Sequence, residues 1–77
     1  MTNEQFKLYL AKRLAQAQER LTQAKRGGDK KEIQQAQADL DLVNDFAKIS
    51  RGAGANLRRV RRDYERRLAR QGKTLTL

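Results

Sequence analysis

Apolar side chains recur three and four residues apart on both sides of a Gly27-Gly28 pair, and no other feature of the chain constrains its fold as strongly. Such a period places one apolar stripe on each of two amphipathic helices. Two helices of similar length joined by so short a turn fold back antiparallel. The sequence therefore predicts a helical hairpin over residues 3–50. Its stripes are Phe6, Leu10, Leu14, Ala17, Leu21 and Ala24, then Ile33, Ala36, Leu40, Val43 and Ala47.

Capping signals place the ends of these two helices. Thr2 and Gln5 fit a capping box, in which each side chain bonds the other residue's backbone amide. Gly27-Gly28 follows two cations and offers the glycine that a left-handed C-cap requires. Asp29 is a suitable N-cap for the helix that follows. The helices are expected at about 3–26 and 30–50.

The second of these helices carries another apolar face, which a single partner helix cannot cover. That face is Leu42, Phe46 and Ile49. A Gly/Ala hinge at 51–55 interrupts the pattern, and a third amphipathic helix is expected at about 56–71, followed by a tail at 72–77. The apolar stripe of this third helix should dock on that second face, in the same chain or in a second copy; it is Leu57, Val60, Tyr64 and Leu68.

The expected fold class is all-α, with residues 1–77 as one small helical domain. The chain contains no Pro, and its short length makes the core marginal. No Cys is present to supply a disulfide. We therefore expect a homodimer, with Leu42, Phe46 and Ile49 as a possible partner or oligomer face, and a compact three-helix monomer as the alternative. The tail is expected to be a frayed terminus rather than an edge strand.

Positive charge is concentrated in the last third of the chain. Residues 51–77 hold nine Lys or Arg against two acids, which accounts for most of the net charge of +9. On a helical wheel five of these arginines share the side opposite the apolar stripe: Arg58, Arg59, Arg62, Arg66 and Arg70. Arginine offers a planar fork that suits phosphates. This pattern indicates nucleic-acid binding, mainly through phosphates, in a regulatory or packaging role.

Other interpretations of the basic helix stay open. It could be a solvated face that maintains solubility, or it could dock on an acidic protein surface. In the latter case the chain would be a phage- or plasmid-type protein that inhibits or adapts a partner through the basic helix or the Leu42, Phe46, Ile49 face. Membrane attachment is disfavoured because the stripe lacks Trp and Phe. Asn56 is expected to be an N-cap rather than a base contact.

Catalytic chemistry has little support. Asp39, Asp41 and Asp45 are the one carboxylate cluster, and with no His or Cys in the chain they are expected to form a solvated acidic face. We expect no enzyme activity, metal, cofactor or small-molecule substrate. The sequence shows no apolar signal or spanning segment, which favours a cytoplasmic location.

The expected hairpin resembles Rop-type RNA-binding hairpin dimers in overall plan. Its size and basic end are similar to those of many small phage or plasmid proteins. The resemblance covers the hairpin alone, rests on the heptad spacing and carries over no functional residue.

Overall fold

A computed structural model describes residues 2–52, 54 and 56–75, and in these ranges the regular structure is three α-helices. They are α1 (Asn3–Gly27), α2 (Lys30–Arg51) and α3 (Leu57–Arg70). The predicted all-α fold is confirmed, with the helix ends within one residue of expectation. Four positions of the predicted hinge and tail lie outside the described residues: Ala53, Ala55, Thr76 and Leu77.

The predicted caps are present. The Thr2 hydroxyl accepts a hydrogen bond from the Gln5 amide at 3.1 Å, and the Gln5 side chain accepts one from the Thr2 amide at 2.8 Å. Gly28 ends α1 with a φ of 77°, a left-handed conformation that favours glycine. The Asp29 carboxylate accepts from the Lys31 amide and starts α2. Because these signals are local, the sequence alone was enough to find them.

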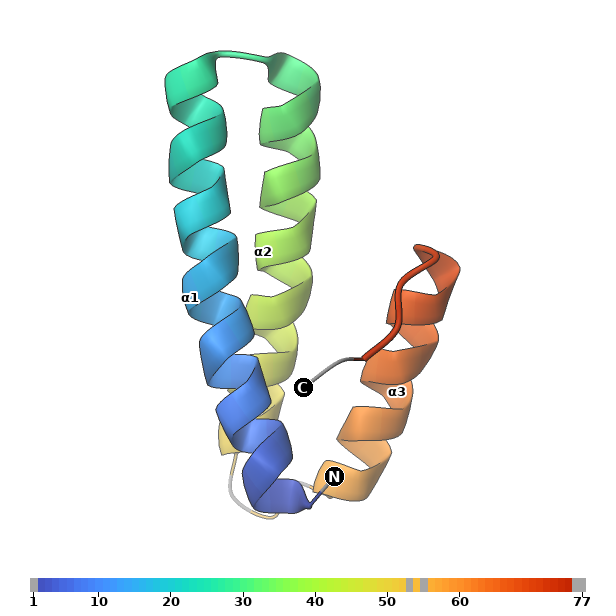
Figure 1. Cartoon of the computed structure of the whole chain (residues 1–77). Helices are drawn as coiled ribbons and strands as arrows, with labels where there is room; N and C mark the ends of the chain where they lie inside the picture. The colour runs from blue at the N-terminus through green and yellow to red at the C-terminus, as the bar shows by residue number, and fades with distance from the viewer. Residues whose placement is uncertain (1, 53, 55, 76–77) are drawn as a thin grey trace.

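Helices α1 and α2 lie antiparallel along most of their length, as Figure 1 shows. Near the Gly28 turn the small Ala24 and Ala36 are buried between them beside Leu21. Ile33 and Leu40 pack there half-buried. The hairpin predicted from the apolar period is therefore confirmed.

The larger core lies at the other end of the hairpin, where all three helices meet. Tyr64 of α3 is fully buried. The centre of its ring lies 5.2 Å from the ring centre of Phe46 on α2 and 6.0 Å from that of Phe6 on α1. Leu42 is buried in the same cluster. The apolar stripe of α3 therefore docks on the second face of α2 within one chain, which was one of the two arrangements expected.

A glycine turn after α3 sends the chain back toward the hairpin (Figure 1). Gly72 has a φ of 72°, its amide donates to the Ala69 carbonyl, and the Lys73 amide donates to the Leu68 carbonyl. These two bonds form a Schellman motif. Leu75 then packs half-buried against the larger core, so the described part of the tail lies against the helices. Fraying of the tail stays a prediction.

Candidate nucleic-acid interface

The outward side of α3 is built from arginines because its inward side is fixed by three buried residues. Val60, Tyr64 and Leu68 are spaced four residues apart and face the hairpin. Side chains half a turn away must then point to solvent. All five predicted binding arginines are exposed there: Arg58, Arg59, Arg62, Arg66 and Arg70.

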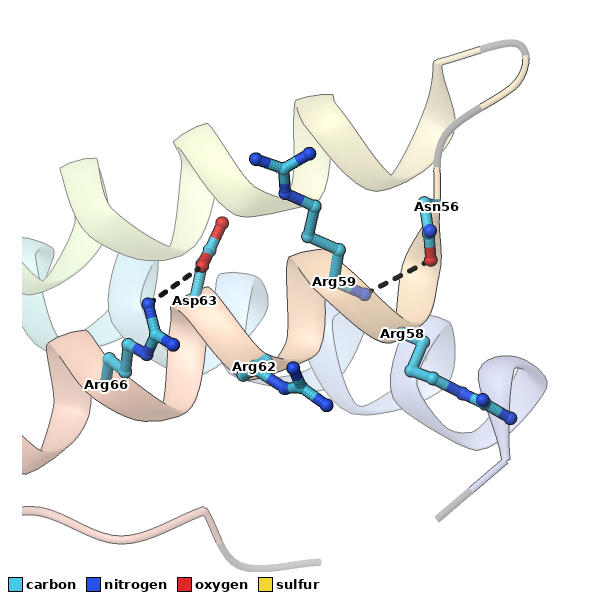
Figure 2. Close-up of a pocket in the computed structure, with 6 residues that line it drawn as sticks. All are labelled: Asn56, Arg58, Arg59, Arg62, Asp63 and Arg66. Carbon is cyan, nitrogen blue, oxygen red and sulfur yellow. Dashed lines mark hydrogen bonds and ion pairs between the residues drawn. The ribbon is translucent and has the colours of Figure 1, made fainter.

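Four of these five arginines gather around one shallow cavity of about 420 Å³. Figure 2 shows their side chains leaving α3 in different directions, with Arg58 and Arg62 extended away from the helix. Asn56 and Asp63 complete the lining. The residues of this arginine face are Arg58, Arg59, Arg62 and Arg66.

The arginine face keeps most of its positive charge. Arg66 lies 4.0 Å from the Asp63 carboxylate, in an exposed i,i+3 pair of little energy. No described acid lies within ion-pair distance of the side chains of Arg58, Arg59 or Arg62. Four guanidinium groups and one carboxylate line the same cavity, and this local excess of positive charge attracts polyanions.

Arg70 lies outside this group. It lines a separate groove between α2 and α3, together with Arg67 and the exposed Asp41 and Asp45. Arg67 also places its guanidinium carbon 5.8 Å from the centre of the Phe46 ring. Acids of α2 and arginines of α3 therefore line the same groove.

Asn56 is the N-cap of α3, as expected. Its side-chain oxygen accepts a hydrogen bond from the Arg59 amide at 3.2 Å (Figure 2). That bond caps the first turn of α3, from which the arginine face begins.

The interpretation of Asp39 as part of a solvated face was wrong. Its side chain is 4% exposed, and one nitrogen of Arg13 donates to both carboxylate oxygens at 3.2 Å. Arg20 Nη1 and Lys73 Nζ lie 3.8 and 3.9 Å from the same carboxylate. A buried carboxylate needs such partners because desolvation disfavours its charged form.

A tyrosine pair extends this buried polar group. The hydroxyls of Tyr9 and Tyr64 lie 3.2 Å apart in a hydrogen bond between α1 and α3. Burial, reinforced by that bond, raises the pKa of the Tyr64 hydroxyl well above its ordinary value. Burial alone would lower the pKa of Arg13, but Asp39 and Tyr64 outweigh it and the net shift is upward, so Arg13 stays charged.

Sequence analysis missed the group around Asp39, although a weak signal exists. Asp39 follows Ala36 by three residues and precedes Val43 by four, which puts it on the buried face of α2. Arg13 stands between Tyr9 and Ala17 in the same way on α1. A charged residue in an apolar stripe predicts a buried ion pair, but only the fold shows which residues pair.

The three residues of the possible partner face have different surroundings. Leu42 and Phe46 are buried beneath α3, whereas Ile49 is 51% exposed. A partner that used all three would have to displace α3. Their role in binding stays a prediction, as do the homodimer and the cytoplasmic location.

In the part of the chain that the structure describes, no three His, Cys, Asp or Glu residues lie close enough together to hold a metal ion. None of the three helices is both long enough and apolar enough to cross a membrane.

Comparison of the chain with protein-family models, curated proteins and solved structures found no match.

Proposed function

We propose that this chain is a non-enzymatic helical protein that binds nucleic acid through the arginine face of α3, mainly by phosphate contacts, in a regulatory or packaging role. The observation that carries the proposal is that Arg58, Arg59, Arg62 and Arg66 line one open cavity on α3, with Asp63 as the one acid of its lining. Guanidinium forks donate two parallel hydrogen bonds to phosphate oxygens. A polyanion binds more strongly to charges clustered in this way than to the same charges dispersed over the surface.

The packing of α3 supports this proposal. Three buried side chains and the Tyr9–Tyr64 hydrogen bond hold the helix against the hairpin before any ligand arrives. Less ordering entropy is then lost on binding than for a disordered basic segment. The hairpin acts as the scaffold, and α3 is the binding element.

The test is the affinity of labelled duplex DNA and of structured RNA, measured by fluorescence anisotropy at about 50 mM salt. Replacing Arg59, Arg62 and Arg66 together by Gln should weaken binding at least about a hundredfold, because each phosphate contact from a charged group contributes more than 1 kcal/mol. A matched control removes three exposed cations elsewhere, as Lys12→Gln, Arg26→Gln and Lys48→Gln.

Circular dichroism would establish that both triple variants are folded. If the α3 variant bound as tightly as the wild type, the proposal would be wrong. If the wild type bound no nucleic acid either, the proposal would also be wrong. Binding to an acidic polypeptide would then be measured, to distinguish a protein-docking surface from a solvated basic face.

A further inference from the structure

A second cavity lies away from the arginine face, where the turn after α3 approaches the hairpin. Its volume is about 410 Å³, within the range of small-ligand sites. The walls come from three segments of the chain: α1, α2 and the turn after α3. The lining residues are Arg20, Gln35, Ala38, Asp39, Gln71 and Lys73.

Positive charge exceeds negative charge at this cavity. Arg13, Arg20 and Lys73 all approach Asp39 within 4 Å, so three cations surround one carboxylate. Glu32 lines an adjoining pocket with Arg20, but no ion pair joins the two in the described structure. The cluster therefore carries about two positive charges that Asp39 does not neutralise.

The cations at the cavity keep donors for a ligand. Arg13 donates hydrogen bonds to both carboxylate oxygens of Asp39. The side-chain nitrogens of Arg20 and Lys73 lie 3.8 and 3.9 Å from that carboxylate, beyond hydrogen-bond length. Their side chains are about half exposed. Both can turn toward an anion in the cavity without releasing Asp39 from Arg13.

Two amides add neutral donors to the same wall. The side chains of Gln35 and Gln71 make no hydrogen bond to another described residue. A primary amide presents two N–H donors. An anion between Arg20 and Lys73 would thus meet donors from α1, α2 and the turn after α3 together.

We propose that this cavity binds a phosphomonoester, the doubly charged phosphate of a free nucleotide or of the 5′ end of a nucleic-acid strand. A phosphate monoester carries nearly two negative charges at neutral pH, which balances the local excess of two positive charges. An internal phosphodiester carries one negative charge and would leave one of the two excess positive charges unbalanced. The proposal is independent of the arginine face, because the two cavities share no lining residue.

Binding at this cavity would also connect the tail to the hairpin. Lys73 reaches Asp39 only because the Schellman turn at Gly72 reverses the chain. A phosphate held by Arg20 and Lys73 would add a second link between α1 and the tail. The ligand should therefore stabilise the folded chain as well as occupy the site.

The experiment is isothermal titration of the full chain with inorganic phosphate and with AMP, at constant ionic strength. We expect binding by both, and a loss of affinity of at least about tenfold in Arg20→Gln with Lys73→Gln, because each variant removes a charge-assisted hydrogen bond. The control pair Lys12→Gln with Lys25→Gln makes the same change of charge at exposed positions and should bind as the wild type does.

Further measurements distinguish strand ends from free nucleotides as the ligand, and this cavity from the arginine face as the binding site. A short oligonucleotide with a 5′ phosphate should bind more tightly than the same strand with a 5′ hydroxyl if strand ends are the ligand; tight AMP binding without that difference assigns free nucleotides. The Arg59, Arg62, Arg66 triple variant should keep its phosphate affinity, so failure of one site is distinguishable from failure of the other.

Two results would overturn the proposal. One is no heat of binding from phosphate or AMP at millimolar concentration; the other is equal weakening by the control pair, which would indicate general attraction to a basic protein. If the double variant did not fold, Lys73→Gln alone, which lies outside the helices, would replace it and should still weaken binding.

Discussion

At the scale of single residues, the most consequential group is the Asp39 carboxylate. It is nearly fully buried, and its partners come from α1 and the tail, so it joins segments that are distant in the sequence. Removing the acid from such a group leaves cations without compensation, and this costs more than the original pairing contributed.

Asp39→Asn should lower the free energy of unfolding by about 3 kcal/mol, because Arg13 would lose its charged partner in a half-buried site. Urea denaturation followed by circular dichroism measures the change. Asp45→Asn is the matched control on the same helix; it is exposed and should change stability by less than about 0.5 kcal/mol. Equal effects of the two variants would contradict the account of Asp39.

Tyr64 makes stability depend on alkaline pH. Its pKa is raised by burial, so above about pH 10 the folded chain holds a proton that the unfolded chain has lost. Stability should be fully present below that pH and fall as the pH rises. Tyr64→Phe removes the titrating hydroxyl, and its urea midpoint should fall less between about pH 9 and 11. Parallel declines in the two proteins would exclude Tyr64 as the cause.

At the scale of elements, α3 is held to the hairpin by side chains from the second face of α2. Phe46 lies beneath α3 and contacts both Tyr64 and Arg67 of that helix. Ile49 belongs to the same face by helical spacing but is half exposed. Two neighbours on one predicted face therefore differ in what they contribute to stability.

Phe46→Ala should cost about 3 to 5 kcal/mol in unfolding free energy, since it empties a packed site between α2 and α3. Ile49→Ala should cost less than about 1 kcal/mol. Thermal unfolding of the two variants gives the comparison. A small loss for Phe46→Ala would mean that α3 does not need this face, and the face would then be open to a partner.

The helices and their ends were predictable from sequence because they depend on local chemistry. The Thr2 and Gln5 capping box, the Gly28 turn and the Asn56 N-cap each involve residues within a few positions of one another. The ion pair of Asp39 could not be predicted in the same way, since Arg13 lies 26 residues before it and Lys73 lies on a tail whose path depends on Gly72. Likewise, a helical wheel groups Arg70 with the other arginines. In the fold, however, Arg70 lines a different groove beside the acids of α2.

At the scale of the whole molecule, the chain is elongated, with extents of 40 × 22 × 19 Å. It exposes 5747 Å², whereas a monomer of its mass, 8.9 kDa, is expected to expose about 4,800 Å². This excess follows from the elongated shape, which exposes more surface per unit mass than a compact one does. Leu8 is 68% exposed and contributes to the apolar part of that surface.

The homodimer stays a prediction, and a second copy would have to bind surface other than the part of the α2 face that α3 covers. Size-exclusion chromatography with light scattering should give twice the mass of 8.9 kDa at micromolar concentration. A mass of one chain at every concentration tested would contradict this expectation. The arginine face is on the outer side of α3, and it would remain accessible in a dimer formed through the hairpin.

The salt dependence of duplex DNA binding tests the central claim most directly. Between about 50 and 200 mM salt, the logarithm of the wild-type association constant should fall with the logarithm of salt concentration at a slope of about −4, as expected for four or five phosphate contacts. The Arg59, Arg62, Arg66 triple variant should have a slope shallower by about 3. A slope near zero in the wild type, or one that the triple variant shares, would show that the arginine face does not bind phosphates.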